Sequence, residues 1–216
     1  MSDTTPKLAA WLALVGAQIV LNYSIRASSG KPDRNTVYHW STAVNAVVFY
    51  GLILAIVVAI ARPDVRDLLA LRAPRSWSQA AGAAIAVFLG VIVVEYALSP
   101  LHPDREQGLT PTHWESSHAG AYIASFVALA VVGPFVEEAT FRGLGYSLLA
   151  RYGQWFAIAA IGILFGLAHG LVEALPILVV LGAGLAWLRA RTESIYPCVF
   201  VHSVFNGLAL VLAVTT

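Results

Sequence analysis

Long runs of apolar residues, separated by short polar segments, follow one another along the whole chain. We recognise seven of them, at about residues 8–25, 37–61, 80–99, 119–142, 154–170, 172–190 and 195–214. A helix needs about 20 apolar residues to cross the hydrocarbon core of a bilayer, whereas a transmembrane β-barrel shows short segments of alternating polarity. The pattern therefore predicts an all-α fold, a polytopic membrane helical bundle with about seven transmembrane helices. An additional re-entrant or interfacial element would make eight.

The composition supports a membrane protein and argues against several other classes. Hydrophobic residues make up 58% of the 216 residues and charged residues 12%, about half of the roughly 25% charged residues in a soluble domain. The formal net charge is +1 and no basic tract occurs, which argues against a nucleic-acid partner and leaves the lipid bilayer as the expected surroundings. Cys198 is the single cysteine, so the chain has neither an intrachain disulfide nor a cysteine metal cluster.

The chain reads as one unit. No internal repeat and no low-complexity linker divides it, so we predict a single membrane domain over residues 1–216. The first apolar run lacks a small-residue cleavage site, and we interpret it as a retained span rather than a signal peptide. The segment RPDVRDLLALRAPRSW, between the second and third runs, mixes leucines with arginines. We expect it to lie along the membrane surface as a short amphipathic helix.

Basic residues indicate the orientation in the membrane. With seven spans, a cytoplasmic N-terminus places nine of them on the cytoplasmic side and four on the other side, and lysine and arginine favour cytoplasmic loops. The nine are Lys7, Arg62, Arg66, Arg72, Arg75, Arg142, Arg151, Arg189 and Arg191; the four are Arg26, Lys31, Arg34 and Arg105. We therefore predict an integral protein of the plasma or inner membrane with its N-terminus in the cytoplasm.

Two adjacent glutamates occur inside the fourth apolar run, in GPFVEEATFRG. Gly133-Pro134 predicts a bend in the helix and a second helical piece from Phe135 to about Tyr152. Glu138 and Arg142 are four residues apart and share a helix face, so we expect them to pair, either as a structural cluster or in support of a site. Glu137 lies about 100° further round the helix. A carboxylate there has no built-in partner and is suited to accept a proton from water.

The fifth run ends in GILFGLAHG, in which Phe165 and His169 are neighbours on one helix face. Its glycines form a small-residue ridge suited to close helix packing. If the chain turns near Gly153, Glu138 lies 15 residues before the turn and His169 lies 16 after it. At about 1.5 Å per residue both are roughly 23 Å from the turn. The matched depth favours a histidine that faces the glutamates over one that only joins two helices.

The seventh run carries a further polar pair, His202 and Asn206, one helical turn apart. Two donors so placed can hold an oxyanion or orient a water, and they can equally form an ordinary interhelical hydrogen bond. Cys198 lies on the same face, so that Cys198, His202 and Asn206 could be read as a nucleophilic set. Residues stacked along one helix rarely reach one carbonyl together, and a structural cysteine is the favoured interpretation.

The three groups together resemble the signature of the CAAX protease and bacteriocin-processing family of intramembrane endopeptidases, also called the abortive-infection family. Its motifs are Glu-Glu-x-x-x-Arg, Phe-x-x-x-His and His-x-x-x-Asn or Asp. They read here as EEATFR, FGLAH and HSVFN, in the same order. The resemblance covers residues 119–216, which we take as the catalytic core of the intramembrane protease domain, and it implies a glutamate-type peptide hydrolase that needs no metal or other cofactor.

The resemblance also implies a role for each residue. Glu137 would be the general base on the attacking water, with His169 positioning or deprotonating that water, while His202 and Asn206 would stabilise the oxyanion. Three further residues would support the site: Glu138, Arg142 and Phe165. Members of the family cut prenylated C-termini or trim C-terminal membrane sorting tails. The implied substrate is therefore a membrane-anchored protein or a lipidated peptide, cleaved near its C-terminus.

Three other interpretations stay open beside this one. A zinc site made of His169, His202 and one glutamate is chemically possible, although the His-Glu-x-x-His helix typical of such sites does not occur. A non-catalytic membrane partner or immunity protein would share the fold, but here no position of the three motifs is missing. A transporter also uses broken helices and buried carboxylates, but the absence of inverted repeats argues against it.

Overall fold

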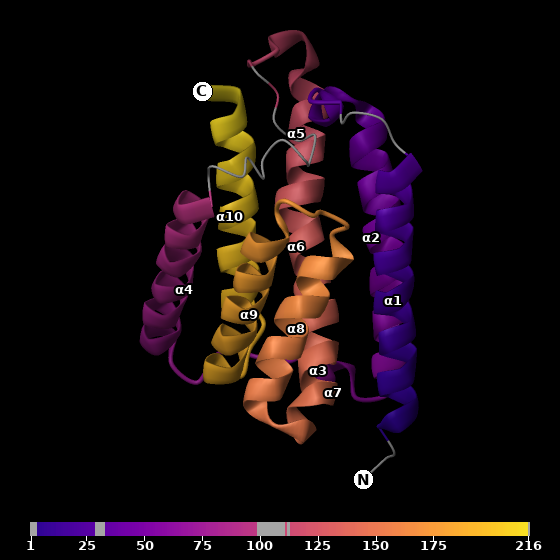
Figure 1. Ribbon diagram of the computed structural model, residues 1–216, viewed down its shortest axis with the longest axis vertical. Coiled ribbons are helices and arrows are strands. Elements are labelled where there is room, and N and C mark those ends of the chain that lie inside the picture. Colours follow the sequence, from indigo (N-terminus) through magenta and orange to yellow (C-terminus); the bar gives the residue numbers. More distant parts are fainter. Residues whose placement is uncertain (1–3, 29–32, 99–110, 112, 216) are drawn as a thin grey trace.

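The computed structural model describes residues 4–28, 33–98, 111 and 113–215. Within these residues the chain is helical and contains no strand, which confirms the predicted all-α class. The α-helices are α1 (Thr5–Ser28), α2 (Trp40–Ala61), α3 (Val65–Leu68), α4 (Trp77–Leu98), α5 (Ala119–Val127), α6 (Gly133–Glu138), α7 (Tyr146–Leu149), α8 (Gln154–Ala168), α9 (Leu175–Thr192) and α10 (Tyr196–Thr215). They form an elongated bundle with the two chain ends at opposite ends of it (Figure 1).

Six helices in the described residues are long and apolar enough to cross a membrane. They are α1, α2, α4, the continuous helical stretch Ser116–Tyr152, α9 and α10. The remaining predicted segment forms α8, which has only 15 residues and is therefore about 22 Å long, against a hydrocarbon core of about 30 Å. A polytopic helical membrane bundle is thus confirmed, with one of the seven predicted segments shorter than a full span.

The helix that carries the two glutamates does not break at Gly133-Pro134. Instead it changes its hydrogen-bond pattern: a π-helical stretch η5 (Ala128–Val132) leads into α6, and a second π-helical stretch η6 (Ala139–Gly145) follows. Pro134 lies in α6 directly after η5, inside this continuous helical stretch, and its missing N–H removes one hydrogen bond from the helical ladder there. The helix therefore continues through this position and does not separate into two pieces. The predicted end is right, because the last turn, η7 (Ala150–Tyr152), stops at Tyr152.

A tight turn then reverses the chain. Gly153 has φ +122°, a conformation that favours glycine, and α8 returns antiparallel to the preceding helix. The glycine ridge of α8 packs on α9 as predicted: a Cβ on Gly162 would lie 2.9 Å from the Cβ of Ala183, and one on Gly182 would lie 2.9 Å from the Cα of Gly162. These two helices therefore approach more closely than larger side chains would allow.

The segment between α2 and α4 differs from its predicted form. Only Val65–Leu68 is helical, and the chain then turns inward so that Leu69 and Ala70 are buried. The N–H of Ile195 donates to the carbonyl of Ala70, which joins this segment to the turn between α9 and α10. Most of the expected surface helix is thus a loop that inserts into the bundle, where Leu69 and Ala70 are buried.

Basic residues gather at the end of the bundle where the chain begins. The start of α1, the α2–α4 segment, the α7–α8 turn and the end of α9 meet there (Figure 1), and Lys7 pairs with Asp64 at 3.3 Å. These segments carry eight of the nine basic residues assigned to the cytoplasm; the ninth, Arg142, is fully buried. Counting Arg142 among them was wrong. Lys31 and Arg105, assigned to the other side, lie outside the described residues.

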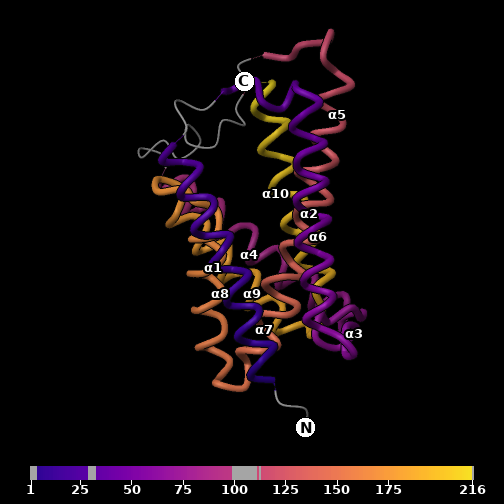
Figure 2. Tube along the Cα trace, turned by 90° about the vertical axis from the view of Figure 1, so that its right-hand side faces the viewer, coloured from indigo at the N-terminus to yellow at the C-terminus, as the bar shows by residue number. Residues whose placement is uncertain are grey.

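Seen from the side, the helices form two groups. α1 and α8 lie together, α2, α5 and α10 lie together, and the groups diverge towards the end that holds the C-terminus (Figure 2). At the other end Trp11 of α1 is fully buried and its indole Nε1 donates to the carbonyl of Thr140 in η6 at 2.9 Å. This contact ties α1 to the glutamate-bearing helix.

Candidate active site

The two glutamates lie at the end of α6 and point to different surroundings. Side chains from three other parts of the chain reach them: Arg142 of η6, His169 directly after α8, and His202 of α10. All come from the helices that sequence reasoning assigned to the site, the fourth, fifth and seventh apolar segments. Helix packing therefore brings together residues that are up to 65 positions apart in the chain.

Glu138 belongs to a closed ionic group, which we call the Glu138 cluster (Glu138, Arg142, Phe165 and His202). Its Oε1 accepts hydrogen bonds from Nη1 of Arg142 and Nδ1 of His202, both at 2.9 Å. The guanidinium of Arg142 also donates to the carbonyl of Gly182 at 3.1 Å and lies 4.1 Å above the ring of Phe165. Glu138 and Arg142 have no exposed side-chain surface. The predicted pair is formed, and several groups share its charge.

Glu137 has a more open environment. Its Oε1 accepts a hydrogen bond of 2.9 Å from the hydroxyl of Tyr50 on α2. Its Oε2 has no hydrogen-bond partner and lies 3.8 Å from Nε2 of His169 and 3.7 Å from Nε2 of His202. The depth argument thus correctly placed His169 opposite the glutamates. These separations exceed direct hydrogen bonds and suit groups that share a bridging oxygen about 2.8 Å from each.

The hydrogen bonds of the two histidines fix which ring nitrogen carries the proton. Nδ1 of His169 lies 2.7 Å from the carbonyl oxygen of Phe165, and a carbonyl can only accept, so Nδ1 is the donor. Nδ1 of His202 likewise donates to the carboxylate of Glu138. In the neutral form of each ring, Nε2 is then a proton acceptor that faces Oε2 of Glu137. His202 donates from Nε2 only as an imidazolium.

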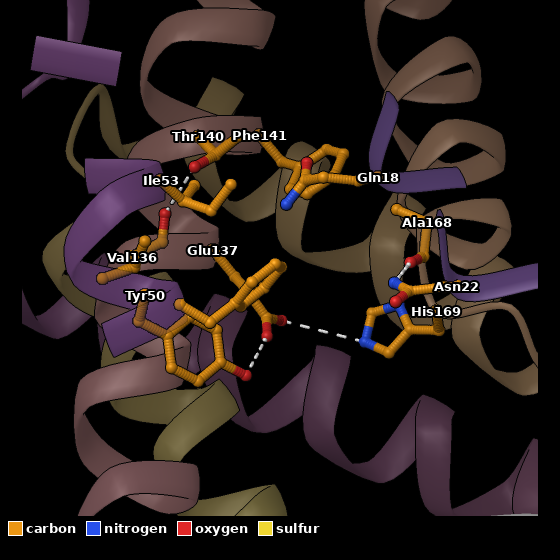
Figure 3. Close-up of a pocket in the computed structure, with 11 residues that line it drawn as sticks. Gln18, Asn22, Tyr50, Ile53, Val136, Glu137, Thr140, Phe141, Ala168 and His169 are labelled. Carbon is orange, nitrogen blue, oxygen red and sulfur yellow. Dashed lines mark hydrogen bonds and ion pairs between the residues drawn. The ribbon is translucent and has the colours of Figure 1, made fainter. Parts of the chain in front are cut away.

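A cavity of about 250 Å³ opens onto Glu137 and His169. Its wall is built from α1, α2, α6, η6 and the end of α8, so it lies between the two helix groups (Figure 3). Apolar and aromatic side chains alternate there with a few polar ones, of which Gln18, Asn22 and Tyr50 come from the first two helices. A cavity on which several polar groups converge beside apolar walls is a candidate ligand site.

Asn206 and Phe165 occupy different positions around this centre. The amide of Asn206 donates to the carbonyl of Leu129 in η5 at 3.1 Å, so one of its two N–H groups is engaged and holds the side chain in place. Neither Asn206 nor His202 is among the residues that line the cavity. The ring of Phe165 lies edge-on to both histidines, with centroids 4.6 Å from His169 and 5.7 Å from His202. It therefore packs against both rings.

The first two helices supply residues that sequence reasoning did not assign to the site. Tyr50 contacts Glu137, Gln18 has an amide oxygen without a partner, and Asn22 donates to the carbonyl of Ala168 at 2.5 Å beside His169. Figure 3 shows all three directed towards the same space. No short motif marks them, because they come from a separate part of the chain and only the helix packing selects which face they occupy.

Two observations bear on the alternative chemistries. In the part of the chain that the structure describes, no group of three or more histidine, cysteine, aspartate or glutamate side chains is placed to hold a metal ion. Cys198 is buried and its thiol lies 3.3 Å from the carbonyl of Leu185 on α9. A thiol engaged there supports the structural interpretation of this residue.

Comparison with known proteins points to one family. Residues 119–208 match the type II CAAX prenyl endopeptidase Rce1-like family. A Bacillus subtilis (strain 168) protein named "Putative membrane peptidase YdiL" is 28% identical over 87 residues, which are 40% of this chain and 36% of that protein. The chain thus spans little more than a third of this relative's length. No solved structure matches the chain. The region matched by the family, residues 119–208, contains all three motifs.

Proposed function

We propose that the chain, whose residues 119–208 match the type II CAAX prenyl endopeptidase Rce1-like family, is an intramembrane endopeptidase of the glutamate type. It hydrolyses a peptide bond near the C-terminus of a membrane-associated substrate, with water activated at Glu137. One observation carries the proposal: an unpartnered carboxylate oxygen of Glu137 faces the Nε2 atoms of His169 and His202 beside a cavity in a membrane bundle.

In the first step, water binds between Oε2 of Glu137 and Nε2 of His169. Both are acceptors, so each takes one hydrogen of the water and the oxygen lone pairs point away from them towards the cavity. Glu137 removes a proton while the oxygen attacks the carbonyl carbon of the scissile bond. The C–N bond then breaks, and the proton held by Glu137 passes to the leaving nitrogen. Positioned general-base catalysis of this kind contributes about 10²- to 10⁴-fold.

The tetrahedral intermediate carries a negative oxygen that needs donors. Asn206 keeps one N–H free after its bond to Leu129, and a charged His202 ring would offer Nε2–H while its Nδ1–H donates to Glu138. The Glu138 cluster holds His202 rigidly, because Arg142 fixes Glu138 and Glu138 fixes the ring. A preorganised donor costs no reorganisation when charge develops.

The substrate follows from the setting of the site. Its groups lie inside a membrane bundle, so the peptide must reach them from the bilayer, as a membrane-anchored protein or as a peptide carrying a lipid. We propose processing of the prenyl-tail type or of the C-terminal sorting-signal type, in the plasma or inner membrane, with the N-terminus of the chain in the cytoplasm.

The decisive experiment compares the C-termini of all membrane proteins, by mass spectrometry, in cells with the wild-type chain and with Glu137→Ala. Truncated C-termini that appear only with the wild type support a peptidase and identify its substrate. Identical C-termini in both would favour a non-catalytic membrane partner instead. Zinc analysis of the purified protein tests the mechanism separately: equimolar zinc, lost together with activity on chelation, would replace the metal-free mechanism by a zinc-dependent one.

A further inference from the structure

Tyr50 forms the one side-chain hydrogen bond to Glu137 among the described residues. It comes from α2, outside the region matched by the family, and its ring lines the cavity beside Glu137 (Figure 3). The hydroxyl donates to Oε1 at 2.9 Å, and the other oxygen, Oε2, is the one that faces the two histidines. One oxygen of the carboxylate therefore accepts the hydrogen bond from Tyr50, while the other oxygen faces the two histidines.

The Tyr50 ring packs against the backbone of a glycine, Gly133. A Cβ on Gly133 would lie 2.8 Å from both Cζ and the hydroxyl oxygen of Tyr50, which is closer than real side chains approach. Gly133 and Glu137 are one helical turn apart on α6, so the bare backbone of one turn receives the ring and the next turn receives its hydroxyl. The presence of glycine at position 133 is therefore explained by the tyrosine rather than by a bend in the helix.

A carboxylate on a glutamate side chain rotates easily, because its last torsion has broad, shallow minima. A hydroxyl that donates to an ionised carboxylate forms a hydrogen bond stronger than one between two neutral groups. We propose that Tyr50 is a positioning residue: its hydroxyl holds the carboxylate of Glu137 in the orientation that directs Oε2 at the two Nε2 atoms. This inference rests on the proposed function for its effect on rate, while the orientation itself is independent of it.

The first test measures the orientation without a substrate. The infrared difference spectrum between the purified wild-type protein and Glu137→Gln gives the carboxylate band of Glu137. Repeating it in a Tyr50→Phe background keeps the ring and removes one hydroxyl, and we expect the band to shift. Tyr122→Phe is the matched control, because the Tyr122 hydroxyl donates at the same 2.9 Å to the carbonyl of Leu210, away from the site. An unchanged band with Tyr50→Phe would overturn the proposal.

The second test measures rate, as the speed with which processed C-termini appear after pulse labelling. Tyr50→Phe should slow it about 10- to 100-fold, as expected for a lost hydrogen bond to a charged group, whereas Tyr122→Phe should leave it unchanged. If Glu137→Ala stops processing but Tyr50→Phe proceeds at full speed, the positioning role is refuted and the proposed function stands. If Glu137→Ala changes nothing, the proposed function fails, and the infrared band alone decides the role of Tyr50.

Gly133→Ala provides a coupled test. The added methyl group displaces the Tyr50 ring and should slow processing about as much as Tyr50→Phe. In a Tyr50→Ala background the ring is absent, so the same glycine substitution should add little. If Gly133→Ala slowed processing by the same factor with and without the Tyr50 ring, Gly133 would not act through Tyr50. That result would contradict this part of the proposal.

Discussion

Glu137 and Glu138 are adjacent residues of the same type, yet the cavity at Glu137 and the Glu138 cluster give their side chains opposite surroundings. Glu138 has no exposed side-chain surface, and its bound oxygen is shared by an arginine and a histidine. Glu137 is 19% exposed and has one hydroxyl donor; each glutamate leaves its Oε2 without a hydrogen-bond partner, but only that of Glu137 faces both histidines beside a cavity. The first arrangement neutralises a charge within the bundle, and the second keeps a charge available. The comparison shows that the helix face gives two adjacent glutamates different surroundings.

The substitution Glu137→Gln tests the difference between the two glutamates most directly. The amide keeps the shape of the side chain but cannot take a proton from water, so the rate of C-terminal processing should fall about 10²- to 10⁴-fold. The melting temperature of the purified protein in detergent should stay close to that of the wild type, because the substitution leaves no buried charge unpaired. A variant that melts much lower would mean that Glu137, like Glu138, has a structural role.

In the Glu138 cluster, by contrast, the loss of one charge should lower the stability of the protein. Arg142→Met leaves the carboxylate of Glu138 buried without its cation, which typically destabilises a protein by about 3–5 kcal/mol. Chemical denaturation in detergent measures this loss. In the double variant Glu138→Leu with Arg142→Met both charges are gone, and most of the lost stability should return, since apolar replacement of a whole buried pair is often neutral. No recovery would show that the pair matters for more than its charges.

Asn206 belongs neither to the Glu138 cluster nor to the residues that line the cavity at Glu137. Asn206→Ala removes a proposed oxyanion donor and the hydrogen bond to Leu129, and the processing rate should fall about 10²- to 10³-fold. Full activity of Asn206→Ala would remove Asn206 from the mechanism and leave only its contact with η5.

Cys198→Ala should have the smallest effect. The thiol faces the carbonyl of Leu185 in the bundle interior, so we expect an unchanged processing rate and a loss of stability of about 1 kcal/mol. Loss of activity without loss of stability would reopen the cysteine-based mechanism.

The sequence predicted those parts of the site that depend on helical geometry alone. The Glu138–Arg142 pair follows from a spacing of four residues, and the position of His169 follows from equal distances to the turn at Gly153. Local rules did not predict the hydrogen-bond pattern around Pro134 or the contact of Tyr50 with Glu137. These depend on how α2 packs against α6, because a tyrosine in an apolar run gives no sign of which face it occupies.

The short helix α8 has a consequence for the membrane itself. After Ala168 the chain runs without helix to Ala174, and Val172 and Glu173 in this stretch are exposed. Non-helical backbone is not tolerated in contact with hydrocarbon, so lipids beside α8 must thin by several ångströms or yield to water. The hydrated surface then dips towards His169, which ends the same helix. If the proposed function holds, longer lipid chains, which resist that thinning, should slow C-terminal processing.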